Sequence, residues 1–187
     1  MCFWRGAKMG TRTNSAGKII RWTVVPIPEG VALVAAGAEG LCAVRLGEAA
    51  AELVAALARQ FPRATLMCDE RALSPLAAIV ADLAAGRPRA EVEAIALDIN
   101  ASPFQELVWR ALRAIPFGET RSYGQIAAAI GAPRAARAVA GACAANPLAL
   151  VIPCHRALGA HGALGGYSYG PARKRALLDV EARAVRV

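Results

Sequence analysis

Residues 138–155 carry no formally charged side chain other than a histidinium at His155. Such a stretch is compatible with a membrane protein, as is the hydrophobic content of 56%. However, Asn146 with Pro147, and then Pro153, interrupt any helix through the run, and its first part is alanine and glycine rather than leucine and isoleucine. We therefore expect a soluble protein. The expected location is the cytoplasm.

The run ends in Pro153, Cys154, His155 and Arg156, which makes Cys154 a candidate activated thiol. A thiolate is the attacking species, and an imidazole and a guanidinium beside the sulfur both favour the charged form. Cysteine is a strong nucleophile, so the site could attack an alkyl carbon as well as a carbonyl. For a lone pair of neighbours, a buried structural cysteine is the simpler interpretation, and the surrounding sequence has to decide.

The second half of the chain has clear helix signals. Ser102, Pro103 and Gln105 form a capping box that begins a helix running to Pro116. Ser122 and Gln125 repeat the device for a second helix, which Gly131 ends, and a third begins near Pro133. Short helices joined in this way predict a helix-turn-helix. We expect a mainly α, winged-helix-like C-terminal domain over residues 101–187.

The first half has strand signals. Apolar and β-branched residues over 19–28 and 31–46 bracket turns at Glu29-Gly30 and at residues 38–40, which is typical of hairpins. Residues 48–59 and 73–85 have helical spacing of apolar side chains. Residues 95–99 are expected to return as one more strand. We predict an α/β (α+β) scaffold domain with a small antiparallel sheet over residues 19–100, after a flexible basic segment at 1–18.

The formal charge of +8 suggests a polyanionic partner, and nucleic acid is the leading candidate, with RNA, the ribosome or a membrane surface as alternatives. The five cysteines are scattered without a Cys-x-x-Cys pair, and only two histidines accompany them. Neither a disulfide framework nor a zinc site is expected, so the metal prediction is none. The N-terminus lacks the long apolar stretch of a secretory signal.

The motif Pro-Cys-His-Arg after an apolar strand resembles the active-site signature of the O6-alkylguanine-DNA alkyltransferases. Further landmarks follow that family's order, most strongly over residues 101–181, and the weaker likeness upstream points to the C-terminal repair half of the bacterial adaptive-response protein. These landmarks are Ser102-Pro103-Phe104-Gln105, Val108-Trp109, residues 115–120, Ser122-Tyr123, residues 135–139, Ala144-Ala145-Asn146 and Gly165-Gly166-Tyr167.

The resemblance implies a ribonuclease-H-like N-terminal domain and a single-turnover reaction. Cys154 would take the alkyl group from O6-alkylguanine in double-stranded DNA irreversibly, with O4-methylthymine as a further expected substrate and with no cofactor. The protein would act as a monomer, with cooperative binding on DNA left open. The adaptive-response protein's four-cysteine zinc sensor has no counterpart here, so phosphotriester sensing is not expected.

The resemblance also implies the binding residues. The helix after the turn would lie in the minor groove, where Arg137 takes the flipped base's place in the stack and small neighbours, Ala136 and Ala138, allow close approach. Tyr123 would crowd the target phosphate, help to rotate the nucleotide out and meet guanine N3. In the base pocket, Tyr167 would stack, the Ser168 region would donate to O6, and Asn146 would order the turn below Cys154. We also expect Tyr169 to narrow this pocket.

Glu181 offers a test of the catalytic interpretation. Its neighbours three and four residues away on the last helix are Leu177, Leu178, Ala184 and Val185, so helical geometry turns the carboxylate toward the apolar side. A buried carboxylate needs a partner. We expect Glu181 to orient His155, which takes the proton of Cys154 directly or through water. The alternative is a frayed helix with Glu181 in solvent.

Two other functions remain open. A lesion-binding protein without transfer activity could share the fold, but relatives of that kind lack the cysteine. A cysteine hydrolase could use the same trio, although its dyad partners are rarely adjacent in sequence. Regulation of transcription is an added role that the sequence leaves open.

Overall fold

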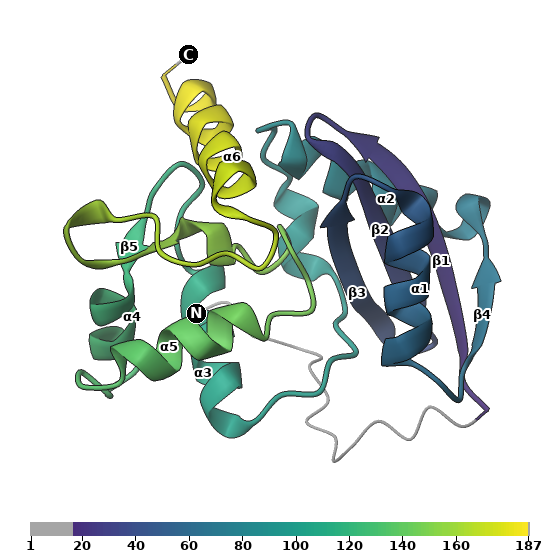
Figure 1. Cartoon of the computed structure of the whole chain (residues 1–187), viewed down its shortest axis with the longest axis horizontal. Helices are drawn as coiled ribbons and strands as arrows, with labels where there is room; N and C mark the ends of the chain where they lie inside the picture. The colour runs from purple at the N-terminus through teal and green to yellow at the C-terminus, as the bar shows by residue number, and fades with distance from the viewer. Residues whose placement is uncertain (1–16, 187) are drawn as a thin grey trace.

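The computed structural model describes residues 17–186. The N-terminal half is a sheet with a helix on each face, and the C-terminal half is a helical assembly beside it (Figure 1). The predicted flexible segment at 1–18 lies almost wholly outside the described residues. Within residues 17–186, no helix is long and apolar enough to cross a membrane.

The sheet is built from a three-strand antiparallel meander and one added strand. Strands β1 (Ile19–Ile27), β2 (Gly30–Gly37) and β3 (Gly40–Gly47) pair in sequence, as the hairpin signals predicted. Helix α1 (Ala50–Gln60) then leads to β4 (Thr65–Cys68), which pairs with β1 in parallel, so the sheet order is β3-β2-β1-β4. Helix α2 (Glu70–Ala84) follows. The sheet is therefore mixed rather than purely antiparallel.

The two faces of the sheet belong to different apolar clusters. Because side chains alternate along a strand, Leu33 and Ala35 of β2 meet α1, whereas Ala32 and Val34 meet α2. The α2 side continues without a break into the apolar residues of the C-terminal half, including Val108 and the run before Cys154. One core thus joins the sheet to the helices, and the domain boundary near residue 100 stays a prediction.

The prediction of a strand at residues 95–99 is wrong. A 3-10 turn (Ala90–Ala94) precedes it, and only Leu97 pairs, as a single bridge with Leu41 of β3. The segment cannot extend because the next positions on that edge of β3 are taken by another part of the chain: Val44 forms a second bridge, with Leu148. The additional strand is β4, at residues that carried no strong pattern.

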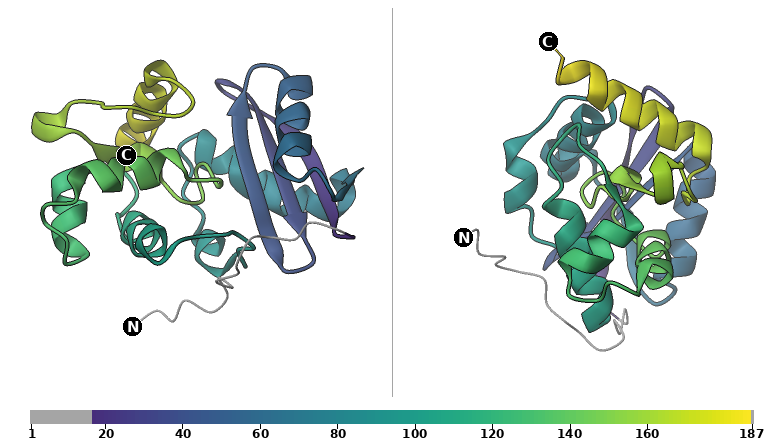
Figure 2. Two further views of the ribbon diagram at one scale, coloured as in Figure 1. Left: turned by 60° about the horizontal axis from the view of Figure 1, so that its bottom comes forward. Right: turned by 90° about the vertical axis from the view of Figure 1, so that its left-hand side faces the viewer.

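The C-terminal half contains the expected helix-turn-helix. Helix α3 (Pro103–Arg113) and helix α4 (Tyr123–Ala129) each begin with a complete capping box, at Ser102 and Ser122. Gly131 has a φ of +77°, a conformation that favours glycine and allows the turn into α5 (Ala136–Ala144). Figure 2 shows these helices and the sheet side by side. The indole of Trp109 in α3 donates to the carbonyl of Ala142 at 2.9 Å and so fixes α5.

Short elements and a long helix complete this half. A 3-10 turn (Cys154–Arg156) leads into β6 (Ala157–Leu158), which pairs in parallel with β5 (Arg121–Ser122). A further 3-10 turn (Ala160–Gly162) and a glycine-rich loop precede α6 (Pro171–Ala184). The segment before Cys154 is not the strand that the family resemblance implied: apart from the bridge at Leu148, it is a series of turns, with a φ of +69° at Leu150.

Candidate active site

Asn146 shapes the turn that presents Cys154. Its side-chain amide accepts from the N–H of Leu148 at 2.9 Å and donates to the carbonyl of Ile152 at 2.8 Å, so it closes the backbone into a compact turn. The same Nδ2 lies 3.2 Å from Sγ of Cys154. The sheet supports this arrangement, because Val44 of β3 donates to the carbonyl of Pro147 and accepts from Ala149. These bonds are the ones on which the expected role of Asn146 in ordering the turn depends, and they include a direct donor to the thiol.

The Cys154 thiol is buried, with 6% of the residue exposed. Burial raises its pKa, while the hydrogen bond from Asn146 and the charge of Lys174 act in the opposite direction. A buried thiol with a dedicated donor is mostly protonated at rest, and its anion is stabilised once it forms. Such a site needs a proton acceptor during reaction.

His155, which follows Cys154 in the sequence, forms a buried pair with Glu181. Nε2 of His155 lies 2.8 Å from Oε1 of Glu181, and both residues are at most 3% exposed. Burial lowers the pKa of His155, against a smaller raising effect of Glu181. Since a carboxylate can only accept, the neutral imidazole carries its proton on Nε2. Nδ1 is then a free lone pair, and within residues 17–186 this buried atom has no hydrogen-bond partner.

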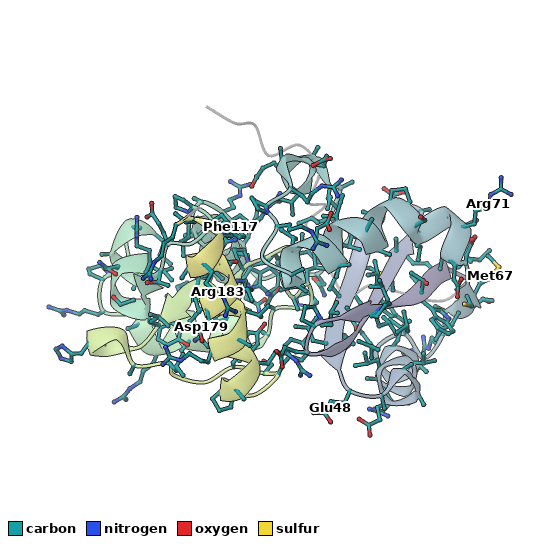
Figure 3. All side chains as sticks on the ribbon, turned by 90° about the horizontal axis from the view of Figure 1, so that it is seen from above. Glu48, Met67, Arg71, Phe117, Asp179 and Arg183 are labelled. Carbon is teal, nitrogen blue, oxygen red and sulfur yellow. The ribbon has the colours of Figure 1, made fainter. Side chains whose placement is uncertain are left out.

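Arg156 also binds Glu181. The sequence had suggested that its guanidinium lies beside the sulfur of Cys154, and this expectation is wrong. Its guanidinium donates to both carboxylate oxygens of Glu181, at 2.9 Å, and to the carbonyl of Ile115, and it lies 5.4 Å from the ring centroid of Phe117. Phe117 is seen beside the C-terminal end of α6 (Figure 3). Burial alone would raise the pKa of Glu181, but the bonds from His155 and Arg156 lower it to about 2. Glu181 is therefore a permanent, fully partnered anion.

Lys174 was missed at the sequence level. It is completely buried, and its Nζ donates to the carbonyl of Ala157 at 2.6 Å and to that of Leu164 in the glycine-rich loop. It also lies 5.8 Å from the ring centroid of Tyr123. The sequence did contain a signal for its burial. Lys174 precedes Glu181 by seven residues on α6, which is about two helical turns, so the two residues share one face of the helix.

Replacing Lys174 by Met should slow the alkylation of Cys154 by iodoacetamide at neutral pH by roughly tenfold, since a buried cation that favours the thiolate is lost. The measurement is the rate against pH, read on the Cys154 peptide by mass. Arg175→Met, at the neighbouring exposed position of α6, is the matched control and should keep the profile of the unsubstituted protein. An unchanged profile in Lys174→Met would show that the lysine serves only the fold.

A small cavity of about 100 Å³ opens beside the thiol. Tyr123 and Tyr167 close two of its sides, and the hydroxyl of Tyr123 donates to the carbonyl of Gly166 at 3.4 Å. The hydroxyl of Tyr167 is buried and has no hydrogen-bond partner among the described residues. The residues that line the cavity are Tyr123, Ala140, Cys143, Ala144, Cys154, Gly166 and Tyr167.

Two of the expected pocket residues lie outside this lining. Ser168 is exposed, and its hydroxyl donates to the carbonyl of Ala144 at 3.1 Å, which ties the loop to α5. Tyr169 was expected to narrow the cavity, but it is not among the lining residues. Its ring packs edge-on against Tyr167, and its hydroxyl donates to the carbonyl of Val44 in β3. It supports Tyr167 from behind because its side chain points toward the sheet.

The outer face of α5 is exposed to solvent. Val139, Ala142 and Cys143 are buried against the core, whereas Arg137 and Ala138 are exposed and Ala136 is half-buried. The α5 residues expected to bind DNA therefore lie toward the solvent side of the helix, while Cys143 on its inner side lines the cavity. A larger apolar groove, between α1 and β4, contains the exposed Cys68 and the carboxylate of Glu70, and no histidine lines it.

Comparison with known proteins shows which sequences this chain resembles. Residues 103–183 match the family model described as 6-O-methylguanine DNA methyltransferase, DNA binding domain. The chain is 43% identical over 164 residues to the bifunctional transcriptional activator/DNA repair enzyme Ada of Escherichia coli (strain K12), covering 87% of this chain and 46% of that protein. It is 60% identical over 89 residues to the methylated-DNA--protein-cysteine methyltransferase of Mycolicibacterium paratuberculosis, and this match covers 48% of this chain and 54% of that protein. The chain thus spans about half the length of these sequence relatives.

A solved structure extends the likeness to the whole fold. The Mycobacterium tuberculosis OGT in complex with DNA superimposes with a TM-score of 0.72 at 38% identity, over 89% of this chain and 94% of that one. Both halves of the present structure are therefore shared with a relative of clear sequence similarity. The chain belongs to the 6-O-methylguanine DNA methyltransferase family.

Proposed function

We propose that this protein repairs alkylated DNA directly, by moving the alkyl group from O6 of guanine to its own Cys154 in one irreversible turnover. The observation that carries the proposal is the buried thiol in the wall of a small cavity, with Asn146 donating to it and the His155–Glu181 pair beside it. Relatives with the printed name methylated-DNA--protein-cysteine methyltransferase support it.

The reaction begins with the thiol proton. Nδ1 of His155 is the free base of the pair, and since no hydrogen bond joins it to Cys154 within residues 17–186, we assign the proton transfer to a bridging water. Glu181 stabilises the imidazolium that forms, and Arg156 holds Glu181 in place. The residues His155 and Glu181 therefore act as base and orienting group.

The thiolate then attacks the alkyl carbon in line with the C–O bond. A C–S bond forms, the C–O bond breaks, and guanine leaves with a proton at the ring. Tyr123 and Tyr167 lie in the cavity wall, and we assign Tyr123 as the donor to N3 and Tyr167 as the ring that stacks on the base. The donor to O6 is assigned to the loop at Ser168, which is tied to α5 just outside the lining. The product is a thioether, which has no ready hydrolytic route, so each molecule acts once and needs no cofactor.

DNA would approach the exposed side of α5. Arg137 would fill the space of the flipped base, and the small side chains Ala136 and Ala138 would let the helix enter the minor groove. The net charge of +8 supports attraction to the phosphate backbone. We further propose action as a monomer in the cytoplasm, with O4-methylthymine as a second substrate.

The test is an intact-mass measurement after mixing the protein with a duplex that contains one O6-methylguanine. We expect a gain of one methyl group, saturating at one per molecule and located on the tryptic peptide 138–156. A duplex with guanine at the same place should give no gain. Tight binding to the lesion without any change in mass would instead indicate a lesion-recognition protein.

Arg137→Ala should slow methyl transfer from duplex DNA by about 10- to 100-fold, because the gap left by the flipped base is no longer filled. Transfer from the free base O6-benzylguanine should change far less, since no flipping is needed. Single-turnover rates on both substrates separate the two effects. Arg63→Ala, at an exposed position of the N-terminal half, is the matched control for loss of one charge; equal slowing on duplex in both variants would contradict the assigned role.

A further inference from the structure

The cavity holds two thiols rather than one. Cys143 comes from the inner face of α5 and Cys154 from the turn after Pro153, and both line the same space of about 100 Å³. Asn146 connects the two: its backbone N–H donates to the carbonyl of Cys143 at 3.3 Å, and its side chain donates to Sγ of Cys154 at 3.2 Å. A disulfide between them requires that the two sulfurs meet within this shared space.

The other described cysteines are placed differently. Cys42 belongs to the apolar cluster under α1, where its thiol donates to the carbonyl of Ala35 at 3.3 Å. Cys68 is exposed on β4, in the groove beside Trp22. Among residues 17–186, Cys143 is thus the one cysteine that shares a cavity with Cys154.

We propose that Cys143 is the resolving thiol of a reversible oxidation site in the base pocket, with a hydroperoxide as the oxidant. The Cys154 thiolate attacks one peroxide oxygen, and the O–O bond breaks, which leaves a sulfenic acid and releases an alcohol or water. The sulfur of Cys143 then attacks the sulfenic sulfur, the hydroxyl leaves as water, and an S–S bond forms. Two thiols lose two electrons, and the peroxide is reduced by two.

The order of the two cysteines follows from their surroundings. Burial raises the pKa of Cys143 to about 12, and the neighbouring Cys154 adds to this effect, whereas Lys174 lowers it. Burial raises the pKa of Cys154 as well, but Cys154 is near the same cation and has, in addition, a hydrogen bond from Asn146 that stabilises its thiolate. The first nucleophile is therefore Cys154, and Cys143 reacts only with the oxidised sulfur, which is a far better electrophile.

The disulfide would have two consequences. It removes the nucleophile and fills the space between α5 and the thiol, so the oxidised protein cannot accept an alkyl group. It also protects Cys154 from further oxidation to the sulfinic acid, which reductants do not reverse. A protein that can act only once on DNA would thus keep its acceptor thiol through a period of oxidative stress.

The experiment treats the full-length protein with hydrogen peroxide, blocks free thiols with iodoacetamide and digests with trypsin. Both cysteines lie in one tryptic peptide, 138–156, because no Lys or Arg occurs between Arg137 and Arg156. We expect this peptide to lose the mass of two hydrogens and to carry no blocking group, while Cys68 stays free to react. Cleavage after Leu150 should give two fragments joined by the disulfide. Cys154 as sulfinic acid beside an unmodified Cys143 would overturn the proposal.

A second arm follows recovery with dithiothreitol, each variant being compared with its own untreated sample. The unsubstituted protein and Cys68→Ala should regain most of their methyl-transfer capacity, whereas Cys143→Ala should regain little, since its Cys154 is overoxidised. Equal recovery in Cys143→Ala would overturn the proposal. This arm rests on the proposed function, but the peptide masses do not, so a failure of either idea is recognised separately.

Discussion

Replacing Cys154 by Ala is expected to abolish alkyl transfer, by at least about 10⁴-fold, because no other group in the cavity is an activated nucleophile. Cys143 lines the same space, but burial keeps its pKa at about 12. The affinity for duplex DNA should persist, since the thiol lies below the surface of α5 that we assign to DNA. The measurements are methyl gain by intact mass and binding to a lesion duplex by fluorescence anisotropy.

Cys154→Ser sharpens the same prediction. The hydroxyl occupies nearly the same volume and can still accept from Asn146, but it is a much weaker nucleophile at neutral pH. It should therefore bind like the unsubstituted protein and fail to react. Cys68→Ala, which changes an exposed cysteine far from the cavity, should retain full transfer. Methyl gain on any residue of Cys154→Ala would show that the acceptor has been assigned wrongly.

The parts of the fold that sequence could predict are those whose signals are local. Capping boxes at Ser102 and Ser122 involve residues three apart, and both are present. The burial of Glu181 followed from its neighbours on one helix, and the residue is 3% exposed. Glycine turns between β-branched segments likewise placed the first three strands.

The errors arise where distant segments compete for the same partners. Residues 95–99 and the run before Cys154 both had strand character, and each obtained a single bridge to β3, at Leu41 and Val44. Neither could extend because they share one edge. Asn146 then satisfies the backbone of the second segment from its side chain, which no periodicity reveals.

The candidate site was predicted by motif where the motif covers it and missed elsewhere. Asn146, Cys154 and His155 lie together because they are close in sequence and a turn brings them to one place. Lys174 was overlooked because a lysine after a proline at a helix start is usually solvated, yet here its Nζ donates to the carbonyls of Ala157 and Leu164. Cys143 was counted as a scattered cysteine, although its place on the inner face of α5 follows from Val139 four residues earlier.

Glu181→Gln is the second large prediction, and it concerns stability. The carboxylate accepts from His155, from the guanidinium of Arg156 and from the N–H of Gly118 at 3.1 Å. An amide leaves the buried Arg156 charge without its counter-ion and presents an N–H₂ group to other donors. We expect the free energy of unfolding at pH 7 to fall by about 3–5 kcal/mol, measured by urea denaturation. Asp179→Asn, an exposed acid on the same helix, is the control and should change it by less than about 0.5 kcal/mol.

The pH dependence of the free energy of unfolding provides a further test of this prediction. The pKa of Glu181 is about 2 in the folded protein and lies near 4.5 when unfolded, so the unfolded state takes up the proton first as the pH falls. The stabilisation is complete above pH 4.5 and is lost between about 4.5 and 2, amounting to about 3 kcal/mol. Burial of neutral His155, whose pKa is lowered, steepens the loss already below pH 6.5. Glu181→Gln should lack the loss of stability between pH 4.5 and 2. Its free energy of unfolding, plotted against pH, should therefore be flatter in this range than that of Asp179→Asn. Parallel curves would mean that Glu181 is not the buried anion on which the orientation of His155 depends.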